Sequence, residues 1–264
     1  YGPVVVRNGR FEFRDRPGVA LRFYGTNLCS AGPFVDRKWA ERLADRMAQY
    51  GFNIFRLHHH DGGLGRKSPT YELDPFKVDQ VDYLVYCLKQ RGIYLTTDLY
   101  ISRRLPAGEI PEYPGKLTDI TAYKALFWVL DSVYENWKAH ARNYLTHVNP
   151  YTKLAIKDDP VLVSINLVNE GNIKSCWGAN AFTRKLYNER FEEWRRARNL
   201  SDGGNPGERN RQFERFLTET YEKRYAQMVK FVRSLGVRCP LSDQNMGATP
   251  KLSLMRRDYD YVDT

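Results

Sequence analysis

The chain has 264 residues, 42% of them hydrophobic and 14% aromatic, a length within the range of single α/β barrel domains. Its formal net charge is +10, but the basic residues are scattered, and the densest group, Arg184 to Arg198, is interleaved with glutamates at helical spacing. This pattern is typical of a solvated helix face, so we expect no nucleic-acid partner. No apolar run approaches the roughly 20 residues of a membrane span, so we expect no membrane partner.

The N-terminal residues 1–20 predict a β-hairpin. Val4–Arg7 and Arg10–Arg14 alternate in polarity and are joined by Asn8-Gly9, a dipeptide that favours a two-residue hairpin turn. A second turn at Arg16-Pro17-Gly18 leads into residues 21–264, which we predict to form β/α units one to six. We expect residues 1–264 together to make a single barrel domain that is truncated at its C-terminus.

From Leu21 onward, short apolar runs alternate with helical patterns, as in β/α units that build a parallel sheet. The predicted strands are Leu21–Asn27, Asn53–His58, Tyr94–Tyr100, Val161–Val168, Arg238–Gln244 and Tyr259–Thr264. The predicted helices are Asp36–Tyr50, Asp74 to Gly92, Ile120–Thr146, Ala179–Arg198, Glu208–Leu235 and Lys251–Arg257. The fourth strand, VLVSINLV, is nearly continuously apolar, which indicates a strand covered on both faces.

These elements predict an α/β fold of the (β/α)₈ TIM-barrel type that is incomplete, with about six of the eight β/α units. Such a sheet cannot close and leaves an open edge. We therefore expect a fragment whose missing C-terminal strands belong to the same parent chain, or an edge that something else covers. A doubly wound sheet is the competing architecture, but the turn NLCSAGP after the first strand lacks its glycine-rich fingerprint.

Polar residues stand at the C-terminal ends of the predicted strands, where barrels of this type carry their chemistry. They are Asn27, Arg56 with His58, Asp98 with Tyr100, Asn169 with Glu170, and Asp243 with Asn245. The strongest signal is Asn169-Glu170, because a carboxyl group desolvated beside a buried strand is suited to proton donation at neutral pH. The 18 tyrosines and 5 tryptophans are suited to gripping the apolar faces of sugar rings.

Three segments, GFNIFRLHHHD, YLTTDLY and SINLVNEGN, resemble a clan of (β/α)₈ glycoside hydrolases, most closely glycoside hydrolase family 5, the cellulase and mannanase family. The likeness covers nearly the whole chain, and its most specific piece is the Asn-Glu pair. It implies a retaining hydrolase of β-linked glycans in which Glu170 is the acid/base, Asn169 is its companion and Arg56 supports the nucleophile.

The same resemblance implies a glutamate nucleophile on a seventh strand and a histidine and an aromatic residue on the sixth. The sequence ends at YVDT before either appears, so we expect this chain alone to be inactive. Tyr100 also departs from the family, because many members carry a histidine there. With that reservation, Arg56, His58, Tyr100 and Trp177 are predicted to shape the sugar subsites, and an oligo- or polysaccharide is the expected partner.

Two other classes of protein compete with this interpretation. His58-His59-His60-Asp61 suggests a metal-dependent hydrolase, with His58 and His60 on one side of a strand. That reading needs more ligands on later strands, whereas His140 and His147 lie in a helical region, so we predict no metal and no cofactor. A non-catalytic carbohydrate-binding or scaffold barrel is the second alternative.

Purely structural roles also compete at individual residues. Glu170 alone fits a helix N-terminal acid or an ion pair, and Arg56 fits a stabilising salt bridge. The four cysteines are far apart without a CxxC pair, so they neither indicate nor exclude an oxidising compartment. Since the chain begins with Tyr1 and shows no signal peptide, we expect either that a leader has been removed or that the sequence has been trimmed. An extracellular or periplasmic location is the expectation that goes with the first of these.

Overall fold

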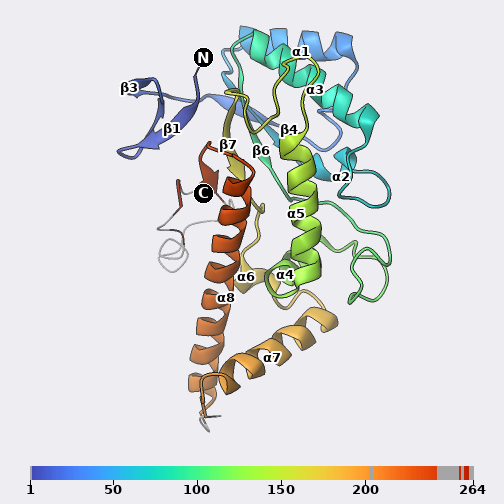
Figure 1. Cartoon of the computed structure of the whole chain (residues 1–264), viewed down its shortest axis with the longest axis vertical. Coiled ribbons are helices and arrows are strands. Elements are labelled where there is room, and N and C mark those ends of the chain that lie inside the picture. Colours follow the sequence, from blue (N-terminus) through green and yellow to red (C-terminus); the bar gives the residue numbers. More distant parts are fainter. Residues whose placement is uncertain (1, 202–204, 243–255, 257–258, 262–264) are drawn as a thin grey trace.

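The computed structural model describes residues 2–201, 205–242, 256 and 259–261 (Figure 1). A small N-terminal sheet lies beside a larger parallel sheet, and helices pack around the larger one. The predicted helix Lys251–Arg257, and the predicted strand-end residues Asp243 and Asn245, lie outside this described part except for Arg256.

The N-terminal sheet is antiparallel and contains β1 (Val4–Arg7), β2 (Arg10–Phe13) and β3 (Arg16–Ala20) in that order. β1 and β2 form the predicted hairpin, and Asn8 and Gly9 at its turn both have a positive φ, as a two-residue hairpin turn requires. The third strand was not predicted, because Pro17 and Gly18 interrupt its pattern. An exposed edge strand tolerates both residues.

The second sheet is parallel, with strands in sequential order: β4 (Gly25–Cys29), β5 (Ile54–His58), β6 (Tyr94–Asp98), β7 (Leu162–Asn166) and β8 (Leu241–Ser242). The first five predicted strands are therefore present in the predicted order, although the first begins at Gly25 rather than Leu21. β4 and β8 lie at the two edges of this sheet.

The predicted sixth strand does not form over its described residues, Tyr259–Tyr261, which lie in bends. The Tyr259 amide donates to the Arg256 carbonyl in a turn, and the Asp260 carboxylate accepts from the Leu241 amide at 2.8 Å. A side chain therefore occupies a backbone donor at the start of β8.

Eight helices are described: α1 (Arg37–Gln49), α2 (Asp61–Leu64), α3 (Pro75–Gln90), α4 (Ile120–Val129), α5 (Asp131–Thr146), α6 (Ile173–Cys176), α7 (Ala181–Arg196) and α8 (Pro206–Ser234). The predicted helix Ile120–Thr146 is two helices, because Leu130 between them is extended, with φ −119° and ψ 118°. α7 and α8 extend away from the sheet at the bottom of Figure 1. None of the helices in the described part of the chain has the length and apolar character that crossing a bilayer requires.

The two faces of the parallel sheet differ in chemistry. Phe55, Leu57 and Leu95 are buried in the main apolar core with the helices. The opposite face, which we call the polar face, carries Arg56, Thr96, Asp98, Ser164 and Asn166. At the other end of the strands, Val4 of β1 packs in a separate apolar cluster with Tyr94 and Val163. The N-terminal sheet thus covers the strand starts, and the carboxyl ends remain for a site.

Candidate functional site

The centre of the candidate site is Asp98 at the carboxyl end of β6. Its carboxylate has no exposed surface and accepts from Arg56 Nη2 at 2.7 Å and Nε at 3.1 Å, a bidentate pair. His58 Nδ1 lies 3.0 Å from the same carboxylate. Because Arg56 and His58 both come from β5, which pairs with β6, one buried carboxylate fixes the side chains of two neighbouring strand ends.

Asn169 joins this network from the loop after β7. Its Oδ1 accepts from Arg56 Nη2 at 3.0 Å, and its backbone amide donates to the Tyr100 carbonyl at 2.9 Å. The side-chain amide nitrogen, Nδ2, is buried and has no hydrogen-bond partner among the described residues. A buried donor without an acceptor is costly, and in a site it is suited to an oxygen of a ligand.

Glu170 follows with φ 51°, a left-handed conformation that non-glycine residues seldom adopt and that clusters at functional sites. Its side chain is 55% exposed. The expectation of a desolvated carboxyl group is therefore wrong for this structure: the carboxyl points off the strand end toward solvent instead of lying in the core. The buried partner of the pair is Asn169, at 1% exposure.

Lys124 of α4 is a site residue that the sequence reasoning missed. Its Nζ lies 3.9 Å from Glu170 Oε2, and only 9% of its side chain is exposed. Burial lowers the pKa of Lys124, and the Glu170 carboxylate opposes that shift. The signal was a single charge inside the apolar run AYKALFWV, where an unpaired lysine is not expected.

Two predicted subsite residues do not face this site. Tyr100 is fully buried, stacks on Tyr123 at 3.8 Å between ring centroids and donates its hydroxyl to the Arg103 carbonyl. The structure therefore places Tyr100 in the core, out of reach of a sugar. Trp177 is half-buried and packs edge-on against Phe213 of α8 at 4.9 Å, so its ring contacts the α7–α8 hairpin.

The histidine run separates into different environments. β5 ends at His58, and His59 has a positive φ of 53°, so strand alternation stops there. His60 is buried beside Thr97 and Tyr144, whereas His58 binds Asp98, so the expectation that His58 and His60 share a side is wrong. Within the described residues, no group of three or more His, Cys, Asp or Glu side chains could hold a metal ion.

Asp61, next in the run, is buried and holds the loop after β6. Its carboxylate accepts from the backbone amides of Ile101, Ser102 and Arg103 at 2.9 to 3.0 Å. This carboxylate is therefore saturated by backbone donors, and its role is to fix the loop that borders the site.

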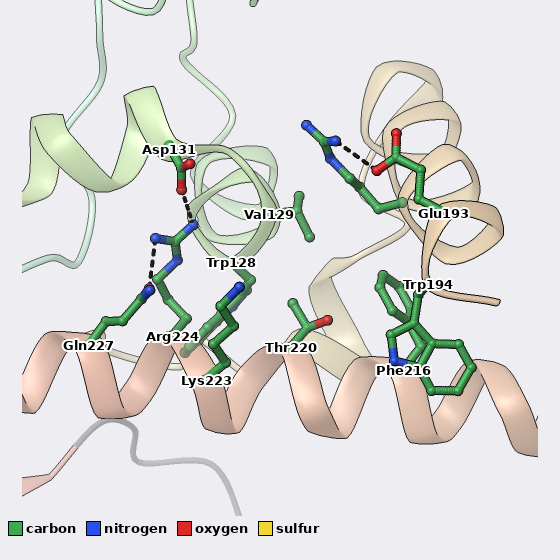
Figure 2. Close-up of a pocket in the computed structure, with 11 residues that line it drawn as sticks. Trp128, Val129, Asp131, Glu193, Trp194, Phe216, Thr220, Lys223, Arg224 and Gln227 are labelled. Carbon is green, nitrogen blue, oxygen red and sulfur yellow. Dashed lines mark hydrogen bonds and ion pairs between the residues drawn. The ribbon is translucent and has the colours of Figure 1, made fainter. Parts of the chain in front are cut away.

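A separate cleft of about 400 Å³ lies between α4, the start of α5, α7 and α8 (Figure 2). Four of its five charged side chains form two ion pairs, Arg190 with Glu193 at 2.8 Å and Arg224 with Asp131 at 2.8 Å; Lys223 is the fifth. Figure 2 shows Trp194 and Phe216 at one end and the Asp131–Arg224–Gln227 group at the other. Because two of its three cations are paired with carboxylates, the lining carries a single excess positive charge, from Lys223.

The fold and the position of the site define an α/β protein with a parallel sheet whose polar groups gather at the carboxyl ends of the strands. Comparison with protein-family models and with curated protein sequences found no match.

Solved structures similar to this chain include an endo-1,4-β-mannanase from Rhizomucor miehei, at a TM-score of 0.59 and 14% sequence identity, covering 98% of this chain and 65% of that one. An endo-β-1,4-mannanase from Thermotoga petrophila matches at a TM-score of 0.53 and 14% identity, covering 88% of this chain and 44% of that one. A hyperthermostable endo-1,4-β-D-mannanase from Thermotoga petrophila RKU-1 matches with the same TM-score and identity, covering 87% and 57%. The resemblance in fold is confirmed, and this chain spans less than two thirds of each protein.

Proposed function

We propose that this chain carries the acid/base part of the active site of a retaining glycoside hydrolase that acts on β-linked glycans. The observation that supports this best is the pair at the end of β7: a buried Asn169 Nδ2 without an acceptor in the described structure, next to an exposed Glu170 carboxyl. In this proposal Glu170 protonates the leaving oxygen and later activates water. Asn169 donates to the sugar 2-hydroxyl.

The retaining mechanism also needs a nucleophile about 5 to 5.5 Å from the acid/base. Asp98 does not fit that role, because its carboxylate has no exposed surface and is bound by Arg56 and His58. We propose instead a glutamate on further strands of the same parent chain that complete the (β/α)₈ barrel. Arg56, held by Asp98, would support that nucleophile, and the 264 residues alone would not turn over substrate.

The proposed substrate is a β-1,4-linked mannan or a related glycan, because the three similar solved structures are named as endo-mannanases. His58, 12% exposed beside Arg56, is placed to border the sugar that Asn169 holds. Polysaccharides of this kind are met outside the cytoplasm, so the proposal includes an extracellular or periplasmic location.

The test is Glu170→Gln in the natural gene product, whose intact mass and sequence are determined first. Hydrolysis of mannan should fall by about 10² to 10⁴-fold, since general acid catalysis contributes this much. Hydrolysis of an aryl β-mannoside with an acidic phenol should fall much less at the glycosylation step, because that leaving group needs no proton. Added azide should restore turnover by attacking the glycosyl-enzyme without a base.

The matched control is Glu189→Gln on α7, whose side chain is also 55% exposed. It should hydrolyse mannan at the normal rate. If Glu170→Gln did the same, the acid/base assignment would be wrong. A gene product that binds mannan but releases no reducing sugar, with or without Glu170, would indicate a carbohydrate-binding barrel instead.

A further inference from the structure

A second pocket, with a volume of about 630 Å³, borders the candidate site at the carboxyl ends of the first three parallel strands. Its walls come from the loops after β4, β5 and β6 and from α3, through residues that include Phe34, His59, Lys77, Ser102 and Arg104. We call this the loop pocket.

The loop pocket is contiguous with the Asp98 network. The His59 ring packs against the His58 ring with 4.4 Å between centroids, and His58 binds Asp98. Ser30, also in the wall, donates its backbone amide to the His58 carbonyl at 2.9 Å. A glycan bound at Asn169 and extended past His58 would therefore enter this pocket with an adjoining sugar unit.

The charge of the loop pocket is uncompensated. Lys77 and Arg104 line it, and no carboxylate does. Arg104 is exposed and makes no hydrogen bond or ion pair with any described residue, and Lys77 Nζ donates only to the Gln80 side-chain oxygen, at 3.4 Å. The cleft in Figure 2 provides the contrast, because Arg190 and Arg224 there are each paired with a carboxylate.

The remaining walls suit a sugar ring. Phe34 offers an apolar surface, and Lys77 Nζ lies over its ring at 5.1 Å. Gly63 permits this arrangement, since a Cβ there would lie 2.5 Å from Phe34 Cε2. Burial lowers the pKa of His59, so the neutral imidazole can exchange hydrogen bonds with hydroxyl groups at neutral pH.

We infer that the loop pocket binds an acidic sugar unit, a uronate, within the glycan whose cleavage is assigned to Glu170. This inference rests on the proposed function and names its substrate class. The planar guanidinium of Arg104 is suited to a carboxylate, and Lys77 supplies a second positive charge from α3.

The experiment measures binding of two tetrasaccharides to the natural gene product by calorimetry at 20 and 150 mM NaCl. The two sugars, β-1,4-mannotetraose and β-1,4-tetramannuronate, have the same linkages. They differ at C6, which is a hydroxymethyl group in each unit of the first and a carboxylate in each unit of the second. At low salt the uronate should bind about three- to tenfold more tightly than the neutral tetramer. Added salt should reduce this difference in affinity, because partly exposed ion pairs are weak and are screened by salt.

Arg104→Gln should remove most of the difference in affinity between the uronate and the neutral tetramer, and Lys77 accounts for what remains. Arg196→Gln on α7 is the matched control, since Arg196 is also exposed and forms no ion pair with any described residue. The difference in affinity between the two tetramers should persist in this variant. Thermal unfolding checks that both variants fold.

Equal affinities for the two tetramers would overturn the inference and leave the proposed function intact. A gap that Arg196→Gln closes as well as Arg104→Gln would also overturn it, because net charge alone would then explain the preference. If O6-sulfated mannotetraose bound more tightly than the uronate, the inference of a uronate would be wrong, and a sulfate ester would be the better assignment. If neither tetramer bound and Glu170→Gln left hydrolysis unchanged, the proposed function would fail as well.

Discussion

Asp98→Asn is expected to reduce the free energy of unfolding by about 2 to 4 kcal/mol at pH 7. The Asp98 carboxylate is completely buried and accepts three hydrogen bonds, two from Arg56 and one from His58. Asparagine keeps one acceptor oxygen and replaces the other with a donating amide, so at least one donor faces another donor. Arg56 also loses its countercharge. Because Arg56 is 16% exposed, water relieves part of that cost, which places the loss below the largest values for buried pairs.

The assay is urea denaturation followed by circular dichroism, with the midpoint and slope fitted separately. Glu193→Gln is the control, because its ion pair with Arg190 is similar in length, 2.8 Å against 2.7 Å, but the Glu193 and Arg190 side chains are 52% and 43% exposed. That change should cost less than about 0.5 kcal/mol. An Asp98→Asn loss as small as the control's would refute the argument that this carboxylate ties the strand ends together.

The hydrogen bond that His147 Nε2 donates to the Asp82 carboxylate raises the pKa of His147. This pair therefore stabilises the fold below about pH 6.5 and loses its contribution as pH rises through the folded pKa. The urea midpoint of His147→Gln should fall less than that of the parent between pH 6 and 9. Burial also raises the pKa of Asp82. If the midpoint of His147→Gln depended on pH as that of the parent does, the assignment to His147 would be contradicted. Burial lowers the pKa of His140 to about 3, so stability should be lost as pH falls from about 6.5 toward 3. In His140→Phe the urea midpoint should fall less over this pH range than it does in the parent. Gly65→Ala should lower the free energy of unfolding by about 1 to 3 kcal/mol, because its Cβ would lie 2.2 Å from a backbone carbonyl oxygen. Gly178→Ala is the control, since its nearest contact would be at 3.8 Å, and it should change the urea midpoint little. Equal midpoints for the two variants would show that the backbone yields at Gly65.

The order of the fold could be predicted from the sequence because each element carries a local signal. The Asn8-Gly9 turn, the Asp74 cap and the apolar run at β7 each act within a few residues of the chain. Asp74 accepts from the Phe76 and Lys77 amides, as an N-cap aspartate should. Where the outcome depended on tertiary contacts, prediction failed. Leu130 breaks a continuous helical pattern, and Asp260 occupies the Leu241 amide where a further strand was expected.

The site could be predicted only in part, for a similar reason. Strand periodicity is enough to predict that Arg56, His58 and Asn169 gather at the carboxyl ends of the parallel strands. It does not show which residues a side chain packs against once the strand has ended. Tyr100 lies two residues beyond β6 and turns into the core against Tyr123. Lys124 approaches Glu170 from a helix more than 40 positions earlier in the sequence, a contact that no local pattern encodes.

In the proposed function, further barrel strands would lie against the polar face of the sheet. Both side-chain polar atoms of Asn166, the Ser242 hydroxyl and Asn169 Nδ2 are buried without a hydrogen-bond partner in the described structure. Each unsatisfied group costs about 1 to 3 kcal/mol, so a stable fold does not keep several of them without a compensating role. They lie along β7, β8 and the loop that carries Glu170, on a face of the sheet that no other strand of the described residues covers. On that proposal, barrel strands that bring hydrogen-bond donors, acceptors and a second carboxylate to this face would satisfy these groups and provide the nucleophile together. Structural stability and catalytic competence are therefore expected to appear in the same molecule.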